Sequence, residues 1–250
     1  MQWKGWLAAL LLTPLAGCAE PARVDYDYYL LALAVAPAFC EDAPQRKQGY
    51  AQCRTLSEAG FIAMPLTLHG LWPNRIDRKH PAWCGGETRG AFCSLPALRL
   101  PADTRAQLAR AMPAAADCLD RYQWVKHGSC SGLDEAAYFA ASAALTERIN
   151  RAIGDEIARH AGREISLALL RDTLSKADPE LKDAVSFDCR MPRTPDPAKR
   201  RPMLREVRIY FERDPATGAP GQPLAYIRAG VRHYNSGCPQ GRAYIDTPLD

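Results

Sequence analysis

The chain has 250 residues, of which 47% are hydrophobic and 24% charged, and its formal net charge is +4. This is the composition of an ordinary globular protein, and the length allows one large domain or two small ones. Such a chain can bury a sizeable core, so it does not need cysteines merely to fold. The charge is compatible with an anionic substrate but is too mild to identify a nucleic-acid-binding protein.

The N-terminus has the features of an export signal. Lys4 provides a positive charge, and the apolar stretch Trp6–Leu15 follows it. The stretch is too short to span a bilayer as a stable helix and is typical of the hydrophobic region of a secretory signal. No later segment is long and apolar enough to cross a membrane.

The signal ends in Leu15-Ala16-Gly17-Cys18, which is similar to a bacterial lipobox. In that case Cys18 would be diacylated and become the mature N-terminus, which would anchor the protein to a membrane surface. The alternative is an ordinary cleaved signal with a Cys near its end. We expect a signal with lipobox over 1–18, a tether over 19–25 and the folded domain over 26–250. The protein would be a periplasmic, membrane-anchored lipoprotein of a Gram-negative bacterium.

Eight cysteines remain in the mature chain after Cys18. An even count in an exported chain predicts disulfides rather than free thiols. No CxxC spacing occurs, and no second pair completes a zinc site with His127 and Cys130. The residues alone leave the disulfide connectivity open among Cys40, Cys53, Cys84, Cys93, Cys118, Cys130, Cys189 and Cys238.

The first third of the chain predicts two strands and two irregular segments. Tyr26–Val35 and Met64–Trp72 are rich in apolar residues and indicate buried strands. Between them, the polar segment Glu41–Ala59 predicts a loop or short helix. Arg75–Leu98 contains Pro, Gly and two Cys, which indicates an irregular surface excursion. Such long excursions in compact domains are often functional or held by cross-links.

The rest of the chain predicts helices followed by strands. The helices are expected over Asp103–Ala111, with a good N-cap, Asp117–His127, Asp134–Ile153 and Ile165–Lys176. The strands are expected over Val185–Cys189, Glu206–Phe211 and Leu224–Arg228, after which no further strand is predicted. Strands at both ends with helices between them favour a single α+β domain with a mostly antiparallel sheet.

His69 lies in Leu68-His69-Gly70-Leu71-Trp72-Pro73, at the end of the second predicted strand. A glycine lets the backbone approach a ligand closely, and Trp72 offers a face on which a base can stack. The alternative for a single His beside an apolar strand is a core histidine with its hydrogen bonds satisfied.

His127 ends the predicted helix over 117–127 and is followed by Gly-Ser-Cys. Gln123 and His127 are four residues apart and would share a helical face, and Lys126 is three residues from Gln123. This places an amide, a cation and an imidazole around one concavity. The alternative is that Lys126 is solvated and His127 interacts only with the helix dipole. His80 and His160 are expected to be solvated. His233 is expected at the surface or at a strand end, with a position in the cleft as the alternative.

The two segments together resemble the active-site motifs of the ribonuclease T2 family. The first motif matches His69-Gly70-Leu71-Trp72-Pro73 and the second Lys126-His127-Gly128-Ser129-Cys130. The strand that leads into Cys40 and the segment Cys118-Leu119-Asp120-Arg121-Tyr122 are also similar, most closely to the bacterial periplasmic branch. The resemblance extends from about Tyr26 to Cys238.

The resemblance implies the disulfide pairing. Cys84 would pair with Cys130 and Cys189 with Cys238. The local pairs Cys40–Cys53 and Cys93–Cys118 would complete the set.

The resemblance also implies a reaction and its residues. RNA carries its own nucleophile, the 2′-hydroxyl, so cleavage needs a base, an acid and stabilisation of the phosphoryl charge. His127 would be the base and His69 the acid, with the roles reversed when the 2′,3′-cyclic phosphate is hydrolysed. Lys126 would stabilise the phosphorane. Trp72, Pro73 and Tyr122 would contact the substrate, which is expected to be single-stranded RNA with little base preference. No metal or other cofactor is needed, and a monomer is expected.

Four positions depart from the family pattern. The second motif commonly begins His-Glu, and this chain has Tyr122 and Gln123. Tyr122 can still donate a hydrogen bond to phosphate. Gln123 belongs to the expected catalytic set, but an amide cannot shuttle a proton, so we expect reduced activity. Ala34-Val35 replaces the family's Ser-Trp or Ser-Gln, which leaves the nucleotide preference open.

Three other functions remain as alternatives. The first is a catalytically weakened RNA-binding protein with the ribonuclease fold. The second is a lipid-anchored envelope protein whose cysteines serve only stability. The third is a metal-dependent phosphodiesterase, which sensitivity to EDTA would reveal.

Overall fold

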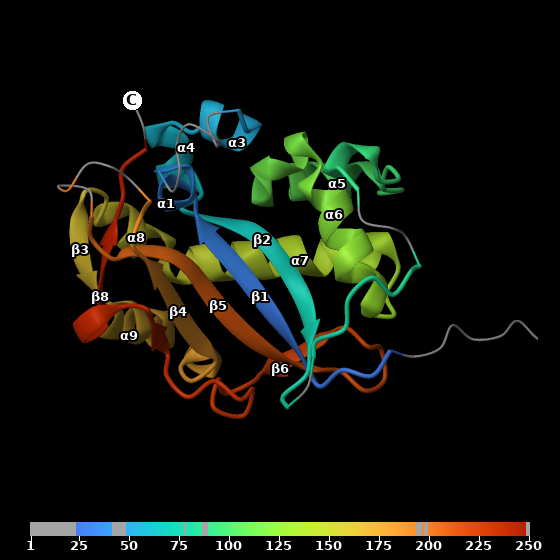
Figure 1. The fold of residues 1–250 in the computed structure, drawn as a ribbon. Helices are drawn as coiled ribbons and strands as arrows, with labels where there is room; N and C mark the ends of the chain where they lie inside the picture. Colours follow the sequence, from blue (N-terminus) through green and yellow to red (C-terminus); the bar gives the residue numbers. More distant parts are fainter. Residues whose placement is uncertain are drawn as a thin grey trace, which may run out of the picture.

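The computed structural model describes residues 24–41, 49–77, 79–86, 90–193, 197 and 200–248. These residues form a single α+β domain in which helices flank a sheet (Figure 1), as the sequence predicted. The predicted signal over 1–18, its lipobox Cys18 and all but the last two residues of the tether lie outside the described residues.

The sheet is mostly antiparallel, and its strands are ordered β2-β1-β5-β4-β7. Strand β7 runs parallel to β4, and β8 is parallel to β5 where the two meet. Off the main path, β6 pairs with β5, and β3 pairs with β8. The strands are β1 Tyr28–Val35, β2 Leu66–Asn74, β3 Arg163–Ser166, β4 Val185–Arg190, β5 Met203–Arg213, β6 Pro220–Pro223, β7 Asn235–Ser236 and β8 Arg242–Ile245.

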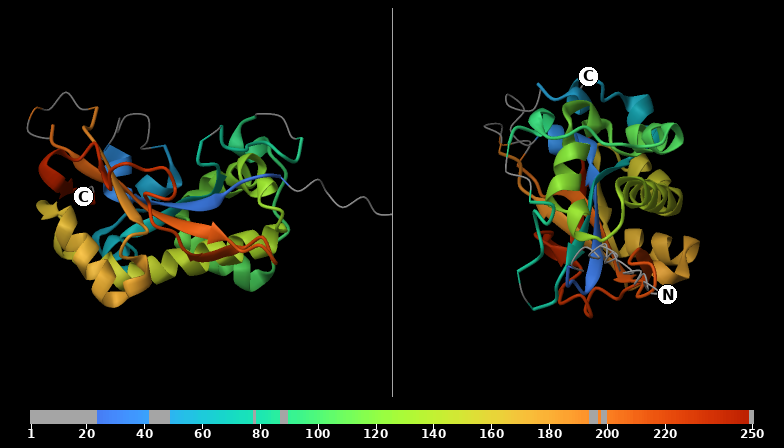
Figure 2. Two further views of the ribbon diagram at one scale, coloured as in Figure 1. Left: turned by 90° about the horizontal axis from the view of Figure 1, so that it is seen from below. Right: turned by 90° about the vertical axis from the view of Figure 1, so that its right-hand side faces the viewer.

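The longest helices lie on one face of the sheet, as the two views of Figure 2 show. A π-helical turn, Asn150–Gly154, joins α7 to α8, so the helical path continues beyond the predicted end at Ile153. The α-helices are α1 Ala36–Glu41, α3 Ala51–Arg54, α4 Glu58–Ala63, α5 Ala102–Ala111, α6 Leu119–Lys126, α7 Glu135–Ile149, α8 Asp155–Arg159 and α9 Leu167–Ala177.

Alternation along the strands divides the sheet into an apolar face and a polar face. Leu31, Leu33 and Val207 are fully buried in the main core together with the apolar sides of the helices. The residues between them point to the opposite face. There the register aligns Thr67, Ala34, Glu206 and Asp188 across four strands. The small side chain of Ala34 leaves space in the middle of this polar row.

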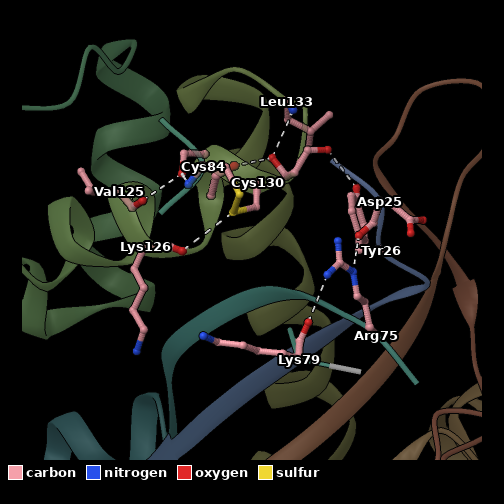
Figure 3. Close-up of a disulfide and its surroundings, with 12 residues drawn as sticks. Asp25, Tyr26, Arg75, Lys79, Cys84, Val125, Lys126, Cys130 and Leu133 are labelled. Carbon is pink, nitrogen blue, oxygen red and sulfur yellow. Dashed lines mark hydrogen bonds between the residues drawn. A yellow bond between two sulfur atoms is a disulfide. The ribbon is translucent and has the colours of Figure 1, made fainter. Parts of the chain in front are cut away.

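Four disulfides join the pairs that the family resemblance implied: Cys40–Cys53, Cys84–Cys130, Cys93–Cys118 and Cys189–Cys238. Cys118 immediately precedes α6, and Cys130 lies just after it. Two disulfides therefore tie both ends of α6 to the irregular excursion over 75–98 (Figure 3 shows Cys84–Cys130). Each closed loop stabilises the fold by about 2–4 kcal/mol on the chain-entropy model. Four disulfides also indicate export to an oxidising compartment.

The predicted strand Leu224–Arg228 is wrong. The segment that pairs with β5 is Pro220–Pro223, and the chain then turns, with Arg228 N donating to Ala225 O. Leu224 is nevertheless buried, in a small cluster with Tyr28, Leu30, Tyr210 and Ala229. Its backbone N–H still donates to Tyr210 O of β5 at 2.9 Å, so the pairing ends at Leu224 and does not continue to Arg228.

Two predicted helix starts also need correction. Ile165 and Ser166 belong to β3, and the helix begins at Leu167, because this segment pairs with β8, a strand that the sequence analysis did not predict. The helix expected from Asp103 begins at Ala102. Its N-cap is Pro101, which makes no side-chain capping hydrogen bond, so the prediction of a good N-cap was wrong.

Candidate active site

His69 projects from β2 on the polar face of the sheet. Its side chain is 39% exposed, and its Nδ1 lies 2.9 Å from Glu206 Oε1. An ionised carboxylate can only accept hydrogen bonds, so Nδ1 carries the hydrogen. This arrangement leaves Nε2 as the atom through which His69 can act on a bound molecule.

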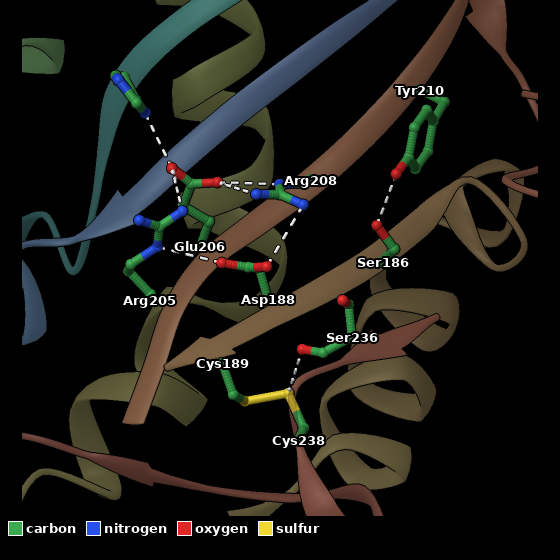
Figure 4. Close-up of polar contacts among 10 residues, drawn as sticks. Ser186, Asp188, Cys189, Arg205, Glu206, Arg208, Tyr210, Ser236 and Cys238 are labelled. Atoms are coloured by element: carbon green, nitrogen blue, oxygen red, sulfur yellow. Dashed lines mark hydrogen bonds and ion pairs between the residues drawn. A yellow bond between two sulfur atoms is a disulfide. The ribbon is translucent and has the colours of Figure 1, made fainter. Parts of the chain in front are cut away.

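Glu206 is only 3% exposed and is held by a network of charges from β4 and β5 (Figure 4). Its Oε2 accepts hydrogen bonds from Arg208 Nε and Nη2 at 2.9 and 2.7 Å. Asp188 forms ion pairs with both Arg205 and Arg208. Burial by itself would raise the pKa of Glu206, but the hydrogen bond with His69 and the charges of His69, Arg208 and Arg205 outweigh it and lower the pKa to about 2. Glu206 is therefore ionised over the ordinary pH range.

Glu206 was not predicted as a site residue from the sequence. It lies in a predicted strand, and its alternation with Arg208 and Tyr210 was visible in the sequence. Alternation shows that these residues share a face but not which other strand lies beside them. The contact with His69 depends on β1 lying between β2 and β5, which local sequence patterns do not specify.

His127 follows α6, and its backbone N–H still donates to Gln123 O at 2.9 Å. Its Nδ1 is buried and has no hydrogen-bond partner among the described residues. Burial, followed by the charges of Lys126, His69 and His80, lowers the pKa of His127 to about 3. The imidazole is therefore neutral at neutral pH.

The indole of Trp72 contacts both imidazoles. Its ring centroid lies 5.1 Å from that of His69, edge to face, and 5.2 Å from that of His127, at an interplanar angle of 30°. Its Nε1 donates to Gln123 Oε1 at 2.8 Å. Trp72 thus joins the two predicted motifs, and the contacts of Gln123 and His127 with it confirm that these two residues share a face of the α6 segment.

Gly70 makes this contact possible. A Cβ at this position would overlap both Trp72 Nε1 and Gln123 Oε1. Gln123 is only 2% exposed, so there is no room to relieve that overlap. The glycine after His69 therefore permits close approach of α6 to β2. From the sequence, we had expected it to permit close approach of a ligand.

Lys126 and Tyr122 lie on the same helix, beside an aromatic cluster. Lys126 Nζ is 5.2 Å from the centre of the Tyr122 ring, and in Figure 3 its side chain extends away from the Cys84–Cys130 disulfide. Tyr122 stacks on Phe92 with centroids 4.3 Å apart and meets Trp83 edge to face at 5.7 Å. Both partners come from the excursion over 75–98. Pro73, in contrast, is buried within β2, a position that does not favour its predicted contact with substrate.

A pocket of about 340 Å³ opens beside His69 on the polar face. Besides His69, its lining includes the polar side chains of Gln123 and Glu206 and the aromatic rings of Phe92 and Tyr122. Arg190, Arg193 and Arg205 contribute positive charge to its wall. Of the pair that departs from the family pattern, Ala34 lines the pocket, whereas Val35 is fully buried in the main core.

The remaining histidines make no contact with the Trp72 indole in the described structure, although the charge of His80 acts on His127. His80 and His233 are exposed, as expected, whereas His160 is half-buried against Glu156, its Nδ1 lying 2.8 Å from the Glu156 carbonyl oxygen. Within the described ranges, no group of three or more His, Cys, Asp or Glu side chains is arranged to hold a metal ion. No helix in those ranges is long and apolar enough to cross a membrane.

Curated relatives include bacterial ribonucleases. The chain is 32% identical over 164 residues to "Ribonuclease I" of Escherichia coli, an alignment that covers 57% of this chain and 61% of that protein. It is 33% identical over 132 residues to "Probable ribonuclease" of Haemophilus influenzae, covering 48% of this chain and 42% of the relative. These matches therefore span less than two thirds of the relatives' own lengths.

Solved structures share the fold. A mutant of RNase MC1 in complex with 5′-UMP aligns with a TM-score of 0.59 and 20% identity, over 88% of this chain and 99% of that one. RNase NT in complex with 5′-AMP aligns with a TM-score of 0.53 and 16% identity, over 80% and 98% of the two chains. The model of the ribonuclease T2 family matches residues 26–218, which include both histidine motifs, and the chain belongs to this family.

Proposed function

We propose that the chain is a metal-independent endoribonuclease that cleaves single-stranded RNA by transesterification through a 2′,3′-cyclic phosphate. The observation that carries the proposal is the pair of imidazoles in contact with one indole, one of them neutral with a buried Nδ1 and the other bonded to a carboxylate. Such a pair offers a proton acceptor and a proton donor within one site.

In the first step, neutral His127 takes the proton of the 2′-hydroxyl, and the 2′-oxygen attacks the phosphorus. Lys126 and the amide N–H groups of Gln123 stabilise the charge on the pentacovalent phosphorane. His69 gives its Nε2 proton to the departing 5′-oxygen, which completes the cyclic phosphate. In the second step the roles reverse: His69 removes a proton from water, and His127 protonates the 2′-oxygen as the ring opens.

The pocket beside His69 is the proposed place for a nucleotide. Phe92 and Tyr122 offer aromatic faces, and stacking on such faces is tolerant of base identity because every base has a π face. The arginines in the wall suit the phosphates of the chain. The solved relatives in complex with 5′-UMP and 5′-AMP support a nucleotide ligand for this fold. Stacking of this kind supports low base specificity.

The location and state of the protein are also proposals. The four disulfides and the N-terminal sequence support a periplasmic enzyme with residues 26–250 as its ribonuclease domain. Lipid attachment at Cys18 would tether it to the membrane, and the enzyme would act as a monomer. Mass spectrometry of the mature N-terminus tests the attachment, and sedimentation tests the monomer.

A catalytically weakened RNA-binding protein is the second candidate, and Gln123 in place of Glu is the observation that favours it. The two candidates differ in one assay. In buffer with EDTA, the wild-type protein should degrade single-stranded RNA, His127→Ala should not, and single-stranded DNA, which lacks the 2′-hydroxyl, should remain intact. Equal activity of the wild type and His127→Ala would overturn the proposal that the protein is a ribonuclease with this mechanism.

A further inference from the structure

Glu206 makes the only side-chain hydrogen bond to His69 that is found within the described residues. It comes from β5, outside both histidine motifs, and its carboxylate faces His69 on one side and two guanidinium groups on the other. Its side chain is only 4% exposed, and both of its oxygens are engaged, Oε1 by His69 and Oε2 by Arg208. Its contact with the reacting groups of the site is therefore the one with His69.

We infer that Glu206 is a positioning residue that holds the Nδ1 hydrogen of His69, directs Nε2 toward the leaving oxygen and stabilises the protonated imidazole. This inference rests on the proposed function for its catalytic consequence. It also assigns a carboxylate to the site, in which the second motif has Gln123 instead of Glu.

The geometry gives the physical reason. A His that acts through Nε2 needs its other nitrogen fixed, and a carboxylate at hydrogen-bond distance fixes both the tautomer and the ring orientation. The 2.9 Å contact meets this requirement, and Trp72 contacts the imidazole from another side. The ring of His69 is thus held by one hydrogen bond and one aromatic contact while Nε2 remains available.

The network beneath Glu206 keeps the carboxylate ionised and in place. Arg208 binds its second oxygen through two N–H groups, and Asp188 fixes Arg208 and Arg205 in turn. Without these cations a buried carboxylate would take up a proton or turn toward solvent. Glu206 and Asp188 balance the two guanidinium groups, so the network remains neutral until His69 is protonated.

Other charged groups lie around His69. His127 interacts electrostatically with both His69 and its neighbour Lys126, and Arg190, Arg193 and Arg205 line the pocket beside His69. All of these, when positively charged, disfavour a proton on His69, whereas Glu206 favours it. Replacement of Glu206 by a neutral residue therefore removes the one negative charge that contacts the His69 ring in the described structure.

The test compares the pH profiles of the wild type and Glu206→Gln on a short single-stranded RNA. Glu206→Gln keeps an oxygen that can accept from Nδ1 but removes the charge. We expect kcat at pH 7 to fall by about 10- to 100-fold with little change in KM. The descending limb of the profile should move to lower pH by about one unit or more. Glu206→Asp, which keeps the charge, should restore the position of that limb.

Two matched controls lie in the same part of the sheet. Asp188→Asn removes a carboxylate that contacts Arg205 and Arg208, and no contact of Asp188 with His69 is present in the described structure, so the limb should move less than in Glu206→Gln. Glu212→Gln removes an exposed carboxylate of β5 that pairs with Arg228, and its profile should match that of the wild type. A profile of Glu206→Gln that differs from the wild type only in height would overturn the inference.

A spectroscopic measurement on the wild type covers the case in which Glu206→Gln does not fold. The ¹⁵N NMR shifts of the neutral His69 ring should show the hydrogen on Nδ1, and a hydrogen on Nε2 alone would overturn the inference. This result does not depend on activity. If the wild type cleaves no RNA, the proposed function fails, yet the NMR result still decides whether Glu206 sets the tautomer.

Discussion

The surroundings of His69 and His127 differ although both rings contact Trp72. His69 lies on a sheet, is partly exposed and has an ionised carboxylate at Nδ1. His127 follows a helix, is half-buried, and has a buried Nδ1 without a partner among the described residues. Burial disfavours a charged imidazole, whereas a carboxylate favours one. Two side chains of the same chemical type are thus prepared for opposite proton-transfer tasks, which is how we assign the base and the acid.

The largest expected effect comes from removing either ring. His127→Ala and His69→Ala should each lower kcat on RNA by about 10²- to 10⁴-fold, the usual contribution of a general base or acid. Initial rates in EDTA measure the loss. Because the contrast assigns a separate role to each ring, the two variants should not complement each other when mixed. If either variant keeps most of the wild-type rate, the histidine that it lacks is not the proton donor or acceptor of the reaction.

A smaller effect concerns stability in acid, and its sign follows from the lowered pKa of His127. The unfolded chain binds a proton at His127 below about pH 6.5, whereas the folded protein does so only near pH 3. The fold therefore loses stability as the pH falls through this window. Between pH 7 and pH 5 the free energy of unfolding of the wild type should fall by about 2 kcal/mol more than that of His127→Gln.

Urea unfolding at the two pH values measures this difference. The low pKa of Glu206 contributes in the same direction, but only below about pH 4.5, so it does not enter the comparison. Equal losses in the wild type and His127→Gln would mean that His127 is not buried as a neutral ring.

Gln123→Glu tests the departure from the family motif. The side chain would still accept the Trp72 indole hydrogen but would offer a carboxylate to the site. We expect kcat to rise by about 10-fold, since a carboxylate can transfer a proton and orient Lys126. Gln123→Ala, the control, should lower kcat because it leaves the indole donor without its acceptor. An unchanged turnover in Gln123→Glu would show that the carboxylate does not matter in this chain.

The smallest effect is expected from Trp72→Phe. The variant keeps an aromatic ring between the two imidazoles and removes only the hydrogen bond to Gln123. The loss of one neutral hydrogen bond of about 1 kcal/mol predicts a decrease in kcat of about 3- to 10-fold. A decrease as large as that in His127→Ala would mean that Trp72 does more than hold Gln123 and the two rings.

The sequence predicted the members of the site better than their partners. His69, Trp72, Gln123 and His127 were identified from two local motifs, and the structure brings them into contact. Glu206 could not be identified, because its contact with His69 depends on the order of strands far apart in the chain. For the same reason β8 was not predicted, because its partner β3 is distant in sequence. The turn after Pro223 was predicted as a strand because its apolar residues resemble one.

The proposed reaction is tested most directly by following its products over time. A defined single-stranded RNA is incubated with the wild type in EDTA, and the cleaved ends are separated by chromatography. We predict that the 2′,3′-cyclic phosphate appears first and converts slowly to the 3′-phosphate, and that His127→Ala forms neither. Products that end in a 5′-phosphate, or a reaction that EDTA abolishes, would contradict the roles assigned to His69 and His127.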